Sequence, residues 1–233
     1  MQIHKEGKVQ VTLTMIIMTL LYALILYYGS AAVKFIALAP YLFVAQTIIS
    51  FYADPQRKYQ GEEKGYVCSP NDGKVVVIER VFENKFIHKE CIQISVYMTF
   101  FDSHCNWIPV SGKITHISHQ EGNFHRAFLP KSSTENEQTA VVIETPEGHK
   151  VLTKQIAGAY ARRIVTYSNV GDCVIIGDGL GFIKFGSRMD IFVPVESEIL
   201  VKIGQKVRFN QTLLAKLPQK SENNKAAKVP LSI

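Results

Sequence analysis

The first 53 residues contain two long stretches without a charged side chain, and these constrain the fold more than any other feature. No charged residue occurs from Val9 to Val33, and after Lys34 none occurs until Asp54. As a helix, the first stretch is long enough to cross a hydrocarbon core of about 30 Å. The second is comparable in length, and its Pro40 is tolerable in a membrane helix. The sequence therefore predicts an apolar helical hairpin over residues 1–53.

Basic residues flank this hairpin on both sides: Lys5 and Lys8 precede it, and Arg57, Lys58 and Lys64 follow it. The positive-inside rule places both ends in the cytoplasm. We therefore expect a protein of the cell membrane whose soluble domain faces the cytoplasm. A cleaved signal peptide is the competing interpretation of the first stretch. A shallow insertion that never crosses the bilayer is the alternative to full spanning.

After a polar linker at 54–64, the chain is rich in β-branched residues as far as 217. The expected strands are separated by Gly, Pro, Asn and Asp, and they cover 74–81, 91–100, 113–118, 139–146, 163–168 and 173–177. At most, a short helix is expected at 154–162. This pattern predicts a mainly β domain of sandwich or barrel type over 65–217. The polar tail, 218–233, is expected to be disordered.

Charge and cysteine content narrow the possible settings of the protein. The net charge of +6 suits an anionic lipid surface and would also suit nucleic acid. The four cysteines form no CxxC pair, so they are expected to be reduced thiols in the cytoplasm. His116, His119 and His125, with Cys105, match no standard zinc spacing, and no metal is expected.

The segment LGFIKFGSRMDIF, residues 180–192, places Gly186 directly before Ser187. Taken alone, this pair indicates a bulge or turn between two strands, although glycine also permits a strained bend beside a hydroxyl. The segment resembles the processing site of phosphatidylserine decarboxylase proenzymes of the short, Gly-Ser form. That resemblance implies that the Ser187 hydroxyl attacks the Gly186 carbonyl. The chain would break between them, and Ser187 would become a pyruvoyl group.

Other segments resemble the same family in the same order. SPNDGKVV (69–76) carries Asp72, for which the resemblance implies a role in orienting or activating a histidine; alone, Asn-Asp-Gly signals a hairpin turn. YMTFFDSHCNWIPVSGKI (97–114) carries the matching histidine, His104, but has Trp107 where relatives carry a basic residue. QIAGAYARRIV (155–165) carries Arg162 and Arg163, and either could bind a substrate carboxylate or phosphate. In a strand only one of the two would face the site.

The resemblance implies an enzyme that converts phosphatidylserine to phosphatidylethanolamine and carbon dioxide. It also implies a Schiff base between the pyruvoyl group made from Ser187 and the substrate amine. The expected partners are phosphatidylserine in the bilayer and the membrane itself, without nucleic acid. The two self-cleaved chains are expected to stay associated, and a higher oligomer is possible.

Two alternatives belong to other classes of protein. Residues 193–217 resemble half of a biotinyl or lipoyl carrier domain, which would keep one intact chain with a modified lysine. The expected lysine at a hairpin tip is not evident. A membrane-anchored β-domain without chemistry is the other alternative, and it would keep an ordinary serine at position 187.

Overall fold

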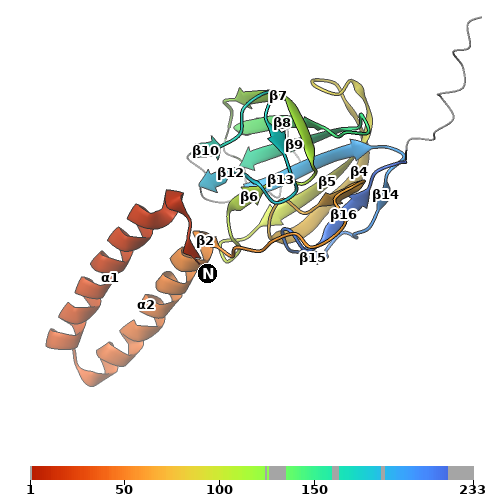
Figure 1. Cartoon of the computed structure of the whole chain (residues 1–233). Helices are drawn as coiled ribbons and strands as arrows, with labels where there is room; N and C mark the ends of the chain where they lie inside the picture. Colours follow the sequence, from red (N-terminus) through yellow and green to blue (C-terminus); the bar gives the residue numbers. More distant parts are fainter. Residues whose placement is uncertain (1, 124, 126–134, 159–162, 185–186, 220–233) are drawn as a thin grey trace, which may run out of the picture.

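The computed structural model describes residues 2–123, 125, 135–158, 163–184 and 187–219, and only the backbone of Ser187. Two N-terminal helices form a hairpin that projects from a β-domain (Figure 1). Helix α1 spans Lys8–Tyr28 and α2 spans Ala31–Phe51, with a tight turn at Gly29 and Ser30. The predicted fold, mainly β with an N-terminal helical hairpin, is confirmed.

The hairpin exposes almost all of its apolar side chains. Only Val11 in α1 and Phe51 in α2 are buried, both close to the β-domain. The helices contact each other through stacked tyrosine rings, Tyr22 and Tyr41, whose centroids are 5.1 Å apart. Both helices are long and apolar enough to cross a membrane. An exposed apolar surface of this extent is typical of a membrane-binding segment.

An eight-stranded antiparallel sheet forms the centre of the β-domain, in the order β11-β7-β8-β9-β13-β5-β4-β15. Strand β13 is central and pairs with β5 on one side and β9 on the other. The sheet curls around an apolar interior (Figure 1). Its strands are β4 (Gly73–Glu83), β5 (Lys89–Met98), β7 (Gly112–Gln120), β8 (Gln138–Glu144), β9 (Lys150–Ala157), β11 (Cys173–Val174), β13 (Ser187–Pro194) and β15 (Lys206–Val207).

Three smaller sheets complete the domain. One contains β10 (Arg163–Thr166), β12 (Gly179–Lys184) and β6 (Cys105–Trp107), and another contains β14 (Glu198–Ile199), β16 (Leu213–Lys216) and β3 (Tyr66–Cys68). The third sheet pairs β1 (Gln2–Ile3) with β2 (Ala53–Asp54). A 3-10 turn at Lys5–Gly7 follows β1 in the chain. This last pair fastens the chain before α1 to the chain after α2, so the base of the hairpin is closed.

Three apolar clusters hold the domain together. The largest fills the curled sheet and includes Ile94, Val96, Met98, Val141, Met189 and Ile191. A smaller one lies on the other face of the sheet, around Leu152 and Phe192. The third joins the hairpin to the domain and consists of Val11, Phe51, Tyr52, Cys105, Trp107, Phe182 and Phe209. The base of the membrane-type hairpin is therefore part of a protein core.

Two local expectations are wrong. The helix expected at 154–162 is not formed over 154–157, which belong to β9 and pair with both β8 and β13. Pairing on two sides overrides a weak local preference. The Asn71-Asp72-Gly73 segment is a bend that joins β3 to β4, which lie in different sheets, and not the turn of a hairpin. The expected disordered tail lies outside the described residues from 220 onward.

Candidate active site

The predicted cleavage point lies where the chain passes from one sheet to another. Strand β12 ends at Lys184 in the β10-β12-β6 sheet, and β13 begins at Ser187 in the centre of the eight-stranded sheet. Ser187 is opposite Met98 of β5 and Ala157 of β9. Gly186 lies outside the described residues. Each of the two strands is thus held by its own neighbours on either side of the Gly186-Ser187 bond.

His104 lies beside the end of β12, where its carbonyl oxygen accepts a hydrogen bond of 3.3 Å from the Ile183 amide. Its imidazole is fully buried and stacks on the Phe51 ring, with centroids 3.8 Å apart. Nδ1 is 2.9 Å from the backbone oxygen of Asp102. Since a carbonyl oxygen only accepts, Nδ1 carries the proton and Nε2 keeps its lone pair. Nε2 has no hydrogen-bond partner among the described residues.

Burial lowers the pKa of His104 from 6.5 to about 4, because the apolar surroundings disfavour the charged imidazolium. The Asp102 backbone oxygen and the Asp102 charge act in the opposite direction and are outweighed. Near neutral pH, His104 is therefore an uncharged imidazole with an available lone pair at Nε2. That is the protonation state of a general base.

The loop from Thr99 to Ser103 fixes His104 to the apolar helical hairpin. The Asp102 carboxylate accepts hydrogen bonds from the Thr99 amide (2.8 Å) and hydroxyl (2.7 Å), which closes the loop into a tight turn. The Ser103 hydroxyl donates to the Ala53 carbonyl (2.5 Å), and the His104 amide donates to the carbonyl of the last residue of α2 (3.2 Å). The end of α2 and the candidate base thus form one structural unit.

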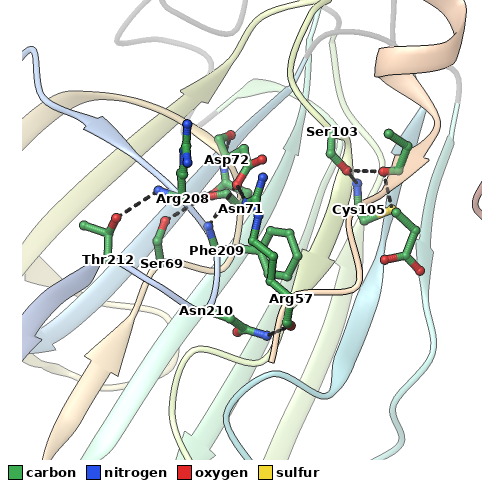
Figure 2. A network of polar contacts seen from close by, with 12 residues as sticks. Arg57, Ser69, Asn71, Asp72, Ser103, Cys105, Arg208, Phe209, Asn210 and Thr212 are labelled. Atoms are coloured by element: carbon green, nitrogen blue, oxygen red, sulfur yellow. Dashed lines mark hydrogen bonds and ion pairs between the residues drawn. The ribbon is translucent and has the colours of Figure 1, made fainter. Parts of the chain in front are cut away.

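Asp72 belongs to a separate polar group, drawn in Figure 2. Its Oδ1 pairs with Arg57 Nη1 at 2.5 Å and accepts the Phe209 amide at 3.0 Å. Trp107 stacks on Phe209 with ring centroids 3.5 Å apart. Among the described residues, no hydrogen bond joins Asp72 to His104. The role of Asp72 in assisting a histidine stays a prediction.

Two of the family-like segments meet through a buried amide contact that the sequence did not indicate. Gln155 Nε2 donates to Asn106 Oδ1 at 2.9 Å, and the Thr166 hydroxyl donates to Gln155 Oε1 at 3.0 Å. A Cβ at Gly181 would collide with the Val165 carbonyl oxygen and lie 2.8 Å from Gln155 Nε2. Only glycine at this position lets β10, β12 and the Gln155 amide approach one another.

The two predicted substrate-binding arginines are described unequally. Arg163 begins β10, is exposed, and lies opposite Lys184 of β12, close to the predicted cleavage point. Lys184 Nζ in turn pairs with Glu6 Oε2 at 3.1 Å, which ties the chain before α1 to β12. Arg162 lies outside the described residues. Which arginine meets the substrate stays open.

The residue after the predicted nucleophile, Arg188, is buried, a feature that sequence reasoning missed. Its Nε lies 2.5 Å from Asp190 Oδ1, and its Nη2 donates to Ser95 Oγ at 2.8 Å. Gln93 Nε2 donates to Asp190 Oδ2 at 3.2 Å. Residues two positions apart in a strand point to the same face. The spacing of Arg188 and Asp190 in an otherwise apolar strand therefore indicated that the two charges could pair. The pair fixes the start of β13 against β5.

A pocket of about 310 Å³ opens between the linker after α2 and the β10-β12-β6 sheet. Its lining includes Arg57, Lys58, Asn106 and Gly181. Basic side chains in such a pocket can bind an anionic group. Within the described part of the chain, no group of three His, Cys, Asp or Glu side chains is arranged to hold a metal ion.

A buried histidine whose pKa is strongly lowered, as at His104 beside the end of β12, is a common feature of enzyme active sites. Residues 44–215 match the family model for phosphatidylserine decarboxylase. The chain belongs to the phosphatidylserine decarboxylase family, whose members are carboxy-lyases made as proenzymes.

Curated relatives extend this match along nearly the whole chain. A phosphatidylserine decarboxylase proenzyme of Porphyromonas gingivalis is 43% identical over 94% of this chain and 100% of its own length. Proenzymes of the same name from Parabacteroides distasonis and Bacteroides thetaiotaomicron are each 44% identical. They cover 93% of this chain, and 99% and 95% of their own lengths.

Proposed function

We propose that this chain is a self-processing, pyruvoyl-dependent decarboxylase that converts phosphatidylserine in a bilayer to phosphatidylethanolamine and carbon dioxide. One observation carries the proposal: the end of β12, just before the Gly186-Ser187 bond in the sequence, lies beside a buried histidine whose Nε2 has no hydrogen-bond partner among the described residues. The family match supports the reaction class, and the order of the segments supports the mechanism.

Self-cleavage would follow from ordinary acyl chemistry. The Ser187 oxygen adds to the Gly186 carbonyl carbon, the amide nitrogen leaves, and an ester joins the two residues. Removal of the Ser187 Cα proton expels the Gly186 carboxylate, and water then releases ammonia to leave a ketone. Each step needs a proton taken or given near neutral pH. His104, neutral and hydrogen-bonded through its carbonyl oxygen to Ile183 of β12, is the residue that we assign to this task.

The surroundings of β13 fit a pyruvoyl group at its start. After cleavage the strand stays paired with β5 and β9, and the Arg188–Asp190 pair fixes the position of its first residues. The group would supply the electron sink that decarboxylation at Cα requires, through condensation with the substrate amine. His104 would then return a proton to Cα, and Arg162 or Arg163 would bind the substrate carboxylate or phosphate.

The two products of cleavage are expected to stay together. The piece that begins at Ser187 contributes β13 and β15 to the large sheet and β14 and β16 to a small one. Those strands pair with β5, β9, β4 and β3 of the first piece. Such an interface is the interior of a domain, so cleavage removes one covalent bond and leaves the core intact.

The helical hairpin explains how a lipid substrate would reach this site. We place α1 and α2 in the cell membrane with the β-domain on the cytoplasmic side, as the flanking lysines and arginines indicate. The base of α2 contacts His104, so the site would lie at the level of the lipid headgroups. The substrate would then enter sideways from the leaflet.

Intact-mass spectrometry tests the proposal. The native chain should give residues 1–186 and a fragment from 187 to 233 whose mass fits an N-terminal pyruvoyl group. Ser187→Ala should remain one inactive chain, whereas Ser118→Ala, in β7, should be processed normally. Borohydride with substrate should attach the lipid to the smaller fragment. An active, uncut chain, or a fragment with an ordinary N-terminal serine, would falsify the proposal.

A second experiment tests the roles assigned to Asp72 and His104. Asp72→Ala should leave the uncut precursor, and His104→Ala should impair cleavage, decarboxylation or both. Normal processing and turnover in both variants would show that neither residue takes part.

A further inference from the structure

The loop between β5 and β6 presents two adjacent phenylalanines to the solvent. Phe100 is 41% exposed and Phe101 is 56% exposed. The Asp102 carboxylate and the Thr99 hydroxyl hold the turn, with the Thr99 oxygen accepting the Phe101 amide at 3.3 Å. The two rings are therefore held at the tip of an ordered turn. Exposed aromatic pairs of this kind are typical of binding surfaces.

The position of this tip relative to α2 identifies its partner. The Phe101 ring packs edge-on against Phe43, with centroids 5.9 Å apart. Phe43 precedes the end of α2 by about two turns, or about 12 Å along the helix axis. The tip thus lies beside a part of α2 that has already left the β-domain, and Phe43 itself is 61% exposed.

We propose that Phe100 and Phe101 form a second membrane contact, a two-phenylalanine wedge that enters the same leaflet as the α1–α2 hairpin. The wedge is continuous with the apolar surface of α2, and Lys5 and Lys8 lie exposed at the start of α1, where anionic headgroups would surround them. The inference rests on the proposed membrane location of the hairpin.

The wedge also sets the depth of the candidate active site. Its loop begins after Met98, which is opposite Ser187, and ends at His104. An insertion of the loop tip would therefore fix the start of β13 and the candidate base at the headgroup level. The hairpin alone would allow the β-domain to tilt, and the wedge supplies a second point of contact that opposes tilting.

Depth-dependent fluorescence quenching tests the wedge in the full chain, reconstituted into phosphatidylcholine–phosphatidylserine vesicles with brominated acyl chains. The Phe101→Trp indole is expected to lose most of its fluorescence. Phe82→Trp is the matched control, because Phe82 is 64% exposed but lies away from the wedge. It is paired with Glu90 at the start of β5, whereas the wedge loop follows the end of β5. Its indole should be unaffected. The native Trp107 is buried and contributes equally to both variants.

The outcomes separate the wedge from the hairpin. Protein that is washed off the vesicles by alkali would overturn both assignments. Protein that stays bound, with no quenching of the Phe101→Trp indole, would overturn the wedge alone; protection of that indole from aqueous iodide would then show that a second copy or another protein covers the tip. Equal quenching of the two indoles would also overturn the wedge, since the contact would not be specific.

Turnover on the same vesicles provides an independent readout. Loss of one phenylalanine's contact with lipid in Phe101→Ser is expected to raise KM about tenfold. Phe101→Leu should restore most of that loss, because the side chain remains apolar, and Phe82→Ser should have no effect. Identical KM values for Phe101→Ser and Phe82→Ser would contradict the proposal.

Discussion

Replacing His104 with asparagine should remove an acid-sensitive part of the free energy of unfolding. The folded chain keeps His104 neutral down to a pKa of about 4, whereas an unfolded histidine has a pKa near 6.5. Between these values the unfolded state binds more protons than the folded state. Stability from this residue is therefore complete above pH 6.5 and is lost as the pH falls toward 4.

The size of the effect follows from the two pKa values. Their difference, at about 1.4 kcal/mol per pH unit, corresponds to about 3 kcal/mol. The side chain is fully buried, so solvent screening does not reduce this figure. For a chain of this size, such a loss lowers the unfolding midpoint by roughly 6–12 °C. His104→Asn keeps a donor near the position of Nδ1 and removes the titration.

The measurement is best made in a Ser187→Ala background, because an unprocessed single chain gives a defined unfolding reaction. The protein has one tryptophan, Trp107, whose stacking on Phe209 makes its fluorescence a probe of the β-domain. Midpoints would be recorded in detergent micelles from about neutral pH down to about pH 4. His4, whose pKa burial also lowers, is present in both chains, so its contribution cancels.

The test compares how steeply the unfolding midpoints of the two chains fall as the pH is lowered. His104→Asn leaves a cavity and should lower the midpoint at every pH, but its midpoint should fall less steeply with acid than that of the parent. Parallel curves for the two chains would refute the assignment of a buried, neutral His104. The proposed base would then lack the protonation state that the mechanism requires.

Three further changes have defined outcomes. Asp190→Ala leaves the buried Arg188 charge uncompensated and should lower the free energy of unfolding by about 3–5 kcal/mol. The control, Glu90→Ala, breaks an exposed pair with Arg80 and should lower it by at most about 1 kcal/mol. Equal losses for the two variants in urea titrations would contradict the role of burial. Phe51→Ala removes the ring stacked on His104 and should cost about 3–5 kcal/mol; because it admits water, the histidine pKa should rise toward 6.5 in an NMR titration, and an unchanged pKa would contradict this account. The whole chain should stay in the membrane fraction through high salt and alkali, since apolar burial is not screened by ions, and release by salt alone would refute the anchoring role of the hairpin.

The helical hairpin, the β class of the domain and the reaction class could all be predicted from the sequence. An uncharged run from Val9 to Val33 is a local property, and it restricts the segment to a helix in an apolar environment whatever the rest of the chain does. Runs of β-branched residues indicate strands in the same local way. The Gly186-Ser187 segment and the segments around Asp72 and His104 indicated the family. The match to the family model and the similarity to the curated relatives confirm it.

The tertiary structure alone decided which of these residues meet. His104 packs on the end of α2, Asp72 pairs with Arg57 rather than with His104, and Gln155 joins Asn106. Residues 154–157 form a strand because β8 and β13 supply hydrogen-bond partners on both sides. These contacts join residues far apart in the chain, and their free energy depends on burial and on partners that no local pattern specifies. The sequence therefore named the candidate groups of the site, and the long-range packing set their neighbours, their protonation and their position relative to the helical hairpin.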